Sequence, residues 1–335
     1  MKLSSKSPCR VDLAGGTLDI WPLYLYHPNA CTVNFAVDRY THCTIETRRD
    51  KQIVLRSRDL ELEESFASLQ EMAESKKQKL PLLAWQLRFW APTLGITVDT
   101  HSEAPAGAGI SGSSSLMISI AHAFNRLTGS PHSTEKLREI CQNIESQVIR
   151  VPTGSQDYYP AMYGGVSVME MSPAGIRRIE IPLDHDEFNS RFVLVYTGAP
   201  RNSGINNWEV MKAHINGDKQ VHKNFEQISA IAFGMRRALE KQDWNEAARL
   251  LREEWSNRRK NCPTITTPLI DRLIEVTRKA GARGAKVCGA GGGGCVIFLV
   301  EPEAKQRVSE LIAAEGAEVL DVKVAPKGVR VKVAA

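Results

Sequence analysis

The stretch that decides the fold reads PAGAGISGSSS and spans residues 105–115 of the 335-residue chain. Its three glycines let the backbone approach a ligand closely, because they carry no Cβ atom. The pattern at 96–100 predicts a strand before the loop, and apolar residues at helical spacing predict a helix over 113–127 after it. The free N–H groups and the dipole of a helix N-terminus attract anions. The loop is therefore predicted to bind phosphate, with hydroxyl groups from the serines at 113–115.

Two other phosphate-binding patterns compete for this loop. Gly107-x-Gly109-x-x-Gly112 matches the dinucleotide fingerprint, but that motif belongs to a first strand–helix–strand unit with an acidic residue about 20 positions further on. Here the loop lies a third of the way along the chain, and positions 130–134 read SPHST. The Walker pattern fails as well, because no Gly-Lys-Ser or Gly-Lys-Thr follows. A glycine-rich turn before a serine-capped helix, without a ligand, stays an alternative.

A second glycine-rich segment, KVCGAGGGGCVIFL, occupies residues 286–299. Five of the six positions from 289 to 294 are glycine, which is entropically costly unless the main chain must pass close to another group. An apolar strand is predicted to follow at 295–300. The segment is therefore predicted to bring main chain beside phosphates and substrate, although a purely structural β-turn would also accommodate these glycines.

Five segments together resemble the motifs of one superfamily, that of galactokinase, homoserine kinase, mevalonate kinase and phosphomevalonate kinase (GHMP kinases). Residues 105–115 are similar to its PxGxGLGSSA loop, and residues 286–294 to its KxxGAGxGG motif. PTGSQDY at 152–158 resembles the segment with the catalytic aspartate, in the GxQDxY form of heptose phosphate kinases. TGAPRNS at 197–203 resembles the TGxxRxS segment of the same enzymes, and SPCRVDLAGGTLD at 7–19 resembles the opening of the sugar kinases.

The resemblance implies a catalytic pair. Asp157 takes the position of the catalytic aspartate, which accepts or orients the proton of the acceptor hydroxyl during phosphoryl transfer. Arg10 takes the basic position that holds this aspartate ionised, because a nearby cation lowers the pKa of a carboxyl group. Without the flanking motif, Asp157 would read as a solvated turn residue.

The resemblance also implies the binding residues. Magnesium would be bound by Ser113, or by Ser114 in the alternative register, together with Glu145, which could otherwise be an exposed helix residue. One carboxylate and one serine suit the preference of magnesium for few protein ligands. ATP would be bound by Gly107, Ala108, Gly109, Ile110, Ser111, Gly112, Ser113, Ser114 and Ser115. The acceptor would be bound by Asp19, Gly16, Thr17, Gly154, Arg201, Gly289, Ala290, Gly291 and Gly292, of which Arg201 could equally cap a surface loop.

The implied fold is α+β with two domains and a cleft between them for ATP and the acceptor. Residues 1–186 would form an N-terminal domain of the ribosomal protein S5 domain 2-like type, and residues 187–335 a ferredoxin-like C-terminal domain. In the second half, the order of the predicted elements suggests a sheet with helices on one face. Strands are predicted at 11–14, 31–37, 41–46, 96–100, 192–196 and 295–300, and helices at 80–94, 113–127, 135–148, 206–216, 221–240, 243–257, 266–280 and 302–315.

The implied function is transfer of phosphate from MgATP to a hydroxyl group of a sugar or sugar phosphate, with the anomeric hydroxyl as the leading candidate. By motif the heptose 7-phosphate kinase and fucokinase branches match best, through Arg10, Asp19, Gln156-Asp157 and Arg201. The Gly-Glu-His-Thr-Asp signature of galactokinase proper is absent. Two alternatives stay open: a mevalonate or phosphomevalonate kinase or related decarboxylase, and a non-catalytic sensor that binds ATP and sugar.

Composition limits the other classes of function. The formal net charge is +5, and the basic residues are scattered without interleaved aromatic residues, so nucleic acid is not expected as a partner. The seven cysteines form no CxxC pair and are predicted to be reduced packing residues. The N-terminal residues lack the apolar segment of a signal peptide, and no apolar run reaches the length of a membrane span. We therefore expect a cytoplasmic protein, either monomer or homodimer, that acts on small molecules.

Overall fold

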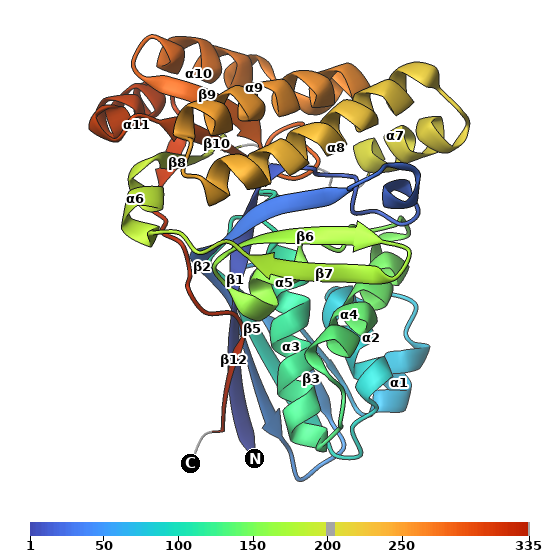
Figure 1. Cartoon of the computed structure of the whole chain (residues 1–335). Coiled ribbons are helices and arrows are strands. Elements are labelled where there is room, and N and C mark those ends of the chain that lie inside the picture. Colours follow the sequence, from blue (N-terminus) through green and yellow to red (C-terminus); the bar gives the residue numbers. More distant parts are fainter. Residues whose placement is uncertain (199–204, 334–335) are drawn as a thin grey trace.

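The structure is a computed structural model that describes residues 1–198 and 205–333, and it contains two β-sheets (Figure 1). Within the described residues the larger sheet has eight strands, ordered β12-β1-β2-β5-β3-β4, and β6 and β7 join it through β2. Pairing is antiparallel except between β3 and β5. The strands are β1 (Lys2–Ala14), β2 (Cys31–Thr47), β3 (Ile53–Ser57), β4 (Leu62–Phe66), β5 (Ile96–Ser102), β6 (Val166–Ser172), β7 (Gly175–Glu180) and β12 (Arg330–Val333).

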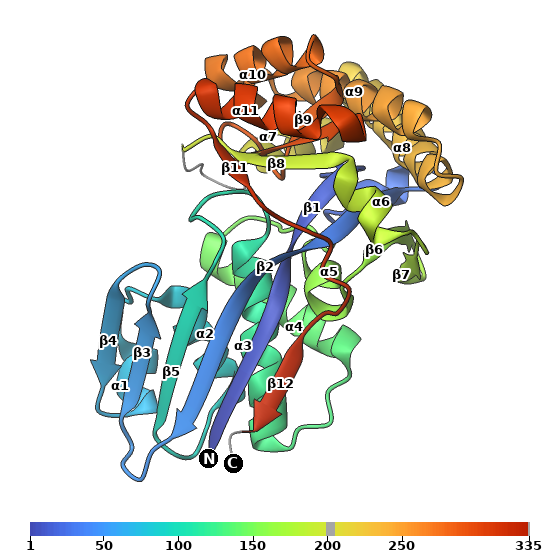
Figure 2. The same cartoon turned by 90° about the vertical axis from the view of Figure 1, so that its left-hand side faces the viewer.

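Helices line one face of this sheet, and in Figure 2 the strands lie in front of them. The central helix α3 buries Met117, Ile120 and Phe124, whose spacing of three to four residues places them on one side of the helix. Gly129 ends it in the left-handed conformation, with φ of 65°. The helix predicted at 113–127 is thus confirmed. The helices here are α1 (Leu69–Glu74), α2 (Pro81–Trp90), α3 (Gly112–Thr128), α4 (Thr134–Ile149) and α5 (Tyr158–Tyr163).

The smaller sheet has the order β11-β8-β10-β9 and is antiparallel. Its strands are β8 (Phe192–Tyr196), β9 (Ala282–Val287), β10 (Cys295–Val300) and β11 (Glu318–Leu320). Around it lie α6 (His185–Ser190), α7 (Ile205–Ile215), α8 (Lys219–Glu240), α9 (Trp244–Asn261), α10 (Pro268–Arg278) and α11 (Lys305–Ala314). Short 3-10 helices are η1 (Leu23–Tyr26), η2 (Pro263–Ile265) and η3 (Pro302–Ala304).

The expectation of helices on one face of this sheet is wrong, because both faces are covered. Every residue of β10 is buried, and alternate side chains enter different hydrophobic clusters. Ile297 and Leu299 pack with residues of α8 and α9. Phe298 and Val300 pack with residues of α10 and α11. An uninterrupted apolar strand is the pattern of a strand buried on both sides.

The C-terminal segment returns to the larger sheet, where β12 pairs with β1 from Leu3 to Lys6. On the way, Gly328 passes so close to α5 that an added Cβ would lie 2.0 Å from the carbonyl oxygen of Met162. One hydrophobic cluster also spans both sheets, with Val11 of β1 and Leu194 of β8 among its members. The division into residues 1–186 and 187–335 therefore stays a prediction, and the last strand belongs to the first sheet.

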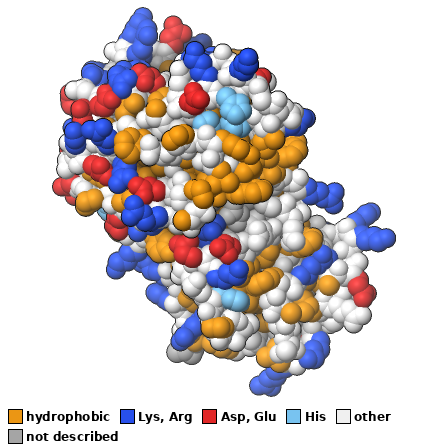
Figure 3. Space-filling view, turned by 45° about the vertical axis from the view of Figure 1, so that its right-hand side comes forward, with side chains coloured by type: hydrophobic (Ala, Val, Ile, Leu, Met, Phe, Trp, Pro, Cys, Tyr) orange, Lys and Arg blue, Asp and Glu red, His pale blue; other side chains and the backbone are white. Residues whose placement is uncertain are grey.

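The surface carries charges of both signs. Figure 3 shows lysine and arginine lying among aspartate and glutamate on one face, with hydrophobic side chains gathered across its middle. Exposed hydrophobic residues of the segment around η1 and of α7 include Trp21, Tyr26 and Trp208. Within the described part of the chain, none of the helices combines the length and the apolar character that crossing a membrane requires.

Candidate active site

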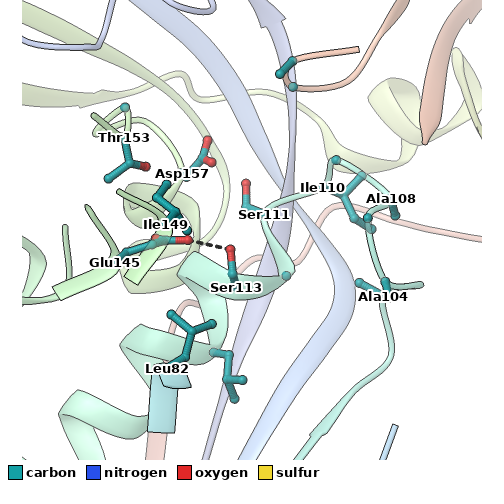
Figure 4. A pocket seen from close by; sticks show the side chains of 18 of the residues that line it. Leu82, Ala104, Ala108, Ile110, Ser111, Ser113, Glu145, Ile149, Thr153 and Asp157 are labelled. Atoms are coloured by element: carbon teal, nitrogen blue, oxygen red, sulfur yellow. Dashed lines mark hydrogen bonds between the residues drawn. The ribbon is translucent and has the colours of Figure 1, made fainter. Parts of the chain in front are cut away.

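A cleft of about 490 Å³ is lined by segments that are distant in the sequence. They are the end of β1 and the turn after it, the loop between β5 and α3, the segment before α5, and the start of the loop between β9 and β10. Figure 4 shows Ser111, Ser113, Glu145 and Asp157 pointing into this space. The cleft therefore brings together residues from four of the five segments that resemble family motifs, namely 7–19, 105–115, 152–158 and 286–294.

The two glycine-rich loops lie against each other beside the cleft. The N–H of Cys295 donates a hydrogen bond of 2.7 Å to the carbonyl oxygen of Ala108. A Cβ on Gly294 would lie 2.6 Å from this oxygen, so contact between the loops requires glycine there. Ser111 precedes α3 in the left-handed conformation, with φ of 63°, and its buried Oγ has no hydrogen-bond partner among the described residues. This hydroxyl is a candidate donor to a phosphate group.

Arg10 and Asp157 form an ion pair at the cleft. Nε and Nη2 of Arg10 donate to Oδ1 of Asp157 over 2.9 and 2.6 Å. Nη1 of the same side chain donates to the carbonyl oxygen of Gly109 over 2.9 Å, which ties the pair to the phosphate-binding loop. Asp157 is the N-cap residue of α5, and its side chain is 24% exposed whereas that of Arg10 is 4% exposed. The arginine is thus fixed, while the carboxylate remains accessible from the cleft.

Asp19 lies at the same end of the cleft and is buried. Its Oδ2 accepts a hydrogen bond of 2.9 Å from the backbone N–H of Gln156, and its Oδ1 accepts one of 3.2 Å from the Gln156 side chain. Burial, and then the charge of Asp157, raise the pKa of Asp19 to about 7. Gly154 leaves the room for this carboxylate, since a Cβ there would lie 2.0 Å from Oδ2. Nearby, Thr17 donates to Oδ1 of Asn207 on α7 over 3.0 Å.

Glu145 on α4 is 4% exposed and faces the start of α3. Ser113 donates to its Oε1 over 2.6 Å, and Ser114 donates to its Oε2 over 2.9 Å. Burial raises the pKa of Glu145, whereas these hydroxyl donors favour its ionised form. The predicted magnesium ligands Ser113 and Glu145 are thus in contact, and the alternative, Ser114, contacts the same carboxylate. Within residues 1–198 and 205–333, no group of three His, Cys, Asp or Glu side chains could hold a metal ion.

Two family models match the chain. Residues 74–165 match the model described as the GHMP kinases N terminal domain, and residues 235–317 match the one described as GHMP kinases C terminal. The chain belongs to the GHMP kinase superfamily. The N-terminal match contains the phosphate-binding loop and Asp157, and the C-terminal match contains the second glycine-rich loop.

Relatives of this GHMP kinase include proteins named as sugar kinases. It is 26% identical over 339 residues to a D-glycero-alpha-D-manno-heptose 7-phosphate kinase of Campylobacter jejuni, and 98% of each chain is covered. It is 26% identical over 344 residues to an L-fucokinase/L-fucose-1-P guanylyltransferase of Bacteroides fragilis, with 92% of this chain and 35% of that protein covered. The crystal structure of a D-glycero-D-manno-heptose 1-phosphate kinase from Bacteroides thetaiotaomicron has a TM-score of 0.78 at 25% identity, and covers 99% of this chain and 100% of that one.

A buried cluster of charges at the wall of the cleft in this GHMP kinase was not predicted from the sequence. Asp12 is 0% exposed, and its Oδ2 contacts Nζ of the fully buried Lys286. Its Oδ1 accepts a hydrogen bond of 2.9 Å from the N–H of Gly289 and lies 3.4 Å from Nη1 of Arg10. Arg258 of α9 lies 3.6 Å from Oδ2 and donates to the carbonyl oxygen of Gly289 over 2.6 Å. Both backbone polar groups of Gly289 are therefore held by this cluster.

The other predicted site residues divide between the cleft and the interior. Gly16, Thr17, Gly154, Gly289 and Ala290 line the cleft together with residues 107–113. Ser115 is buried and donates to the carbonyl oxygen of Ser7 over 3.0 Å, away from the cleft. The N–H of Gly292 donates to the carbonyl oxygen of Ile265, and Gly291 packs against the same residue. Arg201 lies outside the described residues.

The far end of the cleft in this GHMP kinase is mostly apolar. No sequence motif marks a pocket for adenine, and the structure supplies an apolar wall on the side of α2, α3 and α4. The residues that form this wall are Leu60, Leu80, Pro81, Leu82, Leu116, Val148 and Ile149. Ser57, Asp59 and Lys79 line the same end and offer polar groups. An apolar slot with few polar groups suits a flat heterocycle.

Proposed function

We propose that this chain transfers the γ-phosphoryl group of ATP to a hydroxyl group of a sugar or sugar phosphate, with magnesium. The observation that carries the proposal is the Arg10–Asp157 ion pair, whose arginine also donates to the carbonyl oxygen of Gly109 in the phosphate-binding loop. A candidate base is thereby held beside the loop that would hold the phosphates. The relatives named as heptose phosphate kinase and fucokinase support a sugar as the acceptor.

The donor would lie along the cleft, with its adenine in the apolar end and its phosphates on the loop at 107–113. The start of α3 offers free N–H groups, and Ser111 offers a buried hydroxyl without a partner among the described residues. Oxygen atoms of Ser113 and Glu145 suit magnesium, which prefers hard oxygen ligands, few of them from the protein. When bound, magnesium would offset the negative charge that develops on the phosphoryl oxygens.

The chemical step needs only the donor, the acceptor and the residues of the cleft. Asp157 takes or orients the proton of the acceptor hydroxyl, and the hydroxyl oxygen forms a bond to the γ-phosphorus. The bond between this phosphorus and the bridging oxygen breaks, and its electron pair leaves with ADP. The proton passes from Asp157 to solvent. Arg10 holds the carboxylate in place, and its positive charge beside the phosphate-binding loop would offset charge on the transferring group.

The acceptor end of the cleft suits a molecule with several hydroxyl groups. Asp19 and Asp157 are both hydrogen-bond acceptors when ionised, and Thr17 and Asn207 add neutral polar groups. A cluster of hydrogen-bonding groups at this end suits an acceptor with several hydroxyl groups, so it favours the sugar over the mevalonate-type alternative. The proposed acceptor is a heptose, fucose or galactose-like sugar that is phosphorylated at its anomeric hydroxyl. The enzyme is proposed to act in the cytoplasm, where it would meet ATP.

The experiment that tests this function is ADP release from MgATP with a panel of sugars, sugar phosphates, mevalonate and homoserine. We expect turnover that depends on one sugar or sugar phosphate. Turnover with mevalonate alone would favour the mevalonate-type kinase over the sugar kinase. Binding of ATP without turnover on any acceptor would favour the non-catalytic sensor.

The pH dependence of acceptor binding should report on Asp19. Its pKa is raised to about 7, so the carboxyl group is neutral at pH 6 and ionised at pH 8. A hydrogen bond from an acceptor hydroxyl to an ionised group contributes roughly 1 kcal/mol more than one to a neutral group. We therefore expect the acceptor KM to be about fivefold lower at pH 8 than at pH 6, as measured by steady-state kinetics.

The matched variant for this prediction is Asp19→Asn, which keeps the shape and removes the titration. Its acceptor KM should be higher at pH 8 and nearly independent of pH, and the KM for ATP should change little. An unchanged pH dependence in Asp19→Asn would assign the titration to another group.

A further inference from the structure

A third hydroxyl group converges on Glu145 besides those of the two serines. Tyr158 is fully buried, and its phenol donates to Oε2 of Glu145. Burial, together with the charge of Glu145, raises the pKa of Tyr158 well above its ordinary value, so the phenol keeps its proton. The contact thus presents a permanent donor to one oxygen of the carboxylate.

The donors divide unequally between the two carboxylate oxygens. Oε2 accepts from Ser114 and Tyr158, which are both buried. Oε1 accepts from Ser113 alone, and Ser113 is exposed to the cleft (Figure 4). The inner oxygen is therefore held from two sides in the interior, whereas the outer oxygen faces the place where the nucleotide's phosphates would lie.

Tyr158 also follows Asp157 directly and is the first residue of α5. The phenol that holds Glu145 and the candidate base thus belong to one helix start, and any shift of α5 would move both. A carboxylate that is buried but must stay ionised and oriented toward a cation needs such neighbours, since outer-shell donors orient metal ligands.

We propose that Tyr158 is a positioning residue for the magnesium site: it holds Oε2 of Glu145 in the interior so that Oε1 faces the metal. The inference rests on the proposed function, because it presupposes that Glu145 binds magnesium with the nucleotide. It assigns a role to a residue of the GxQDxY segment that does not line the cleft.

The test is calorimetric binding of the non-hydrolysable analogue AMPPNP, in excess magnesium and in EDTA, to the wild-type chain and to Tyr158→Phe. The ratio of the Kd in EDTA to the Kd in magnesium measures how strongly the metal supports nucleotide binding. Loss of an outer-shell partner commonly lowers metal affinity about 10- to 100-fold, so we expect this ratio to fall about 10-fold or more. The concentration of magnesium that gives half-maximal turnover should rise by a similar factor.

Tyr159→Phe is the matched control. Tyr159 is the next residue of α5, is equally buried, and donates over 3.0 Å to Glu135 instead of Glu145. The ratio of the Kd in EDTA to the Kd in magnesium should be the same for Tyr159→Phe as for the wild-type chain. An unchanged ratio in Tyr158→Phe would overturn the inference, and so would an equal weakening with and without magnesium, which marks a general structural defect. A wild-type ratio near one would overturn the magnesium site itself and the inference with it.

Discussion

Replacing Asp157 by asparagine is expected to lower kcat by about 10²- to 10⁴-fold, the usual contribution of a general acid or base. Asparagine has nearly the same shape but cannot accept the proton of the acceptor hydroxyl. The affinity for ATP should stay close to that of the wild-type chain, because Asp157 touches the phosphate-binding loop only through Arg10. Steady-state kinetics with the acceptor found in the panel measures the first effect, and calorimetry with ATP measures the second.

The control for this variant is Asp99→Asn. Asp99 lies on β5, does not line the cleft, and pairs with Arg58 over 2.6 Å. The kcat of Asp99→Asn should be unchanged. If Asp157→Asn retained more than a tenth of the wild-type kcat, Asp157 would have an orienting role at most, and the proton would leave by another route.

The phosphate-binding and catalytic segments could be predicted from the sequence because each demands unusual local chemistry. The close contact of Gly294 with Ala108 excludes any side chain at position 294, and the glycines of this loop can be recognised in the sequence. The run of serines at the start of α3 can be recognised in the same way. Asp157 was selected through its motif, and the structure places its partner Arg10, 147 positions away, in contact with it. These roles stay predictions until activity is measured.

The charge cluster around Asp12 could not be predicted in this way. Asp12 lies between the buried apolar residues Val11 and Leu13 of β1, and Lys286 follows it after 274 positions. A charged residue between buried apolar neighbours indicates that a partner is needed, but only the contact of β9 with the end of β1 shows which one. The contact between Tyr158 and Glu145 was missed for a different reason. Nothing in the residue type separates a tyrosine that packs from one whose hydroxyl holds a carboxylate.

The layering of the smaller sheet was mispredicted for a similar reason. Helical periodicity shows that α8 and α9 have an apolar side but does not show which surface that side covers. Gly284 of β9 resolves the arrangement, because an added Cβ there would meet the carbonyl oxygen of Ala248 at 2.9 Å. A helix can approach a strand so closely only where the side chain is missing. This close approach brings α9 and Arg258 toward the start of the second glycine-rich loop.

Replacing Asp12 by alanine is expected to have the largest effect on stability. Burial alone would raise the pKa of Asp12. The cations of Lys286, Arg10 and Arg258 nevertheless hold this pKa well below its usual value. Removal of Asp12 would break the ion pair of the fully buried Lys286, whose charge then acts on the buried Glu254 alone among these carboxyl groups, and breaking a buried ion pair costs about 3–5 kcal/mol. We expect a loss of this size in the free energy of unfolding, as measured by urea titration followed by circular dichroism.

A second variant separates the charge from the position. In the double variant Asp12→Asn, Lys286→Met the buried pair is neutral, and such replacements are often close to neutral for stability. We expect it to recover most of the urea midpoint lost in Asp12→Ala. The kcat of the double variant should remain below that of the wild-type chain, because Asp12 also orients Arg10 and Gly289 at the cleft. Glu63→Ala, which removes a surface pair with Arg56, should leave the midpoint unchanged. Full recovery of kcat in the double variant would mean that the cluster serves stability alone.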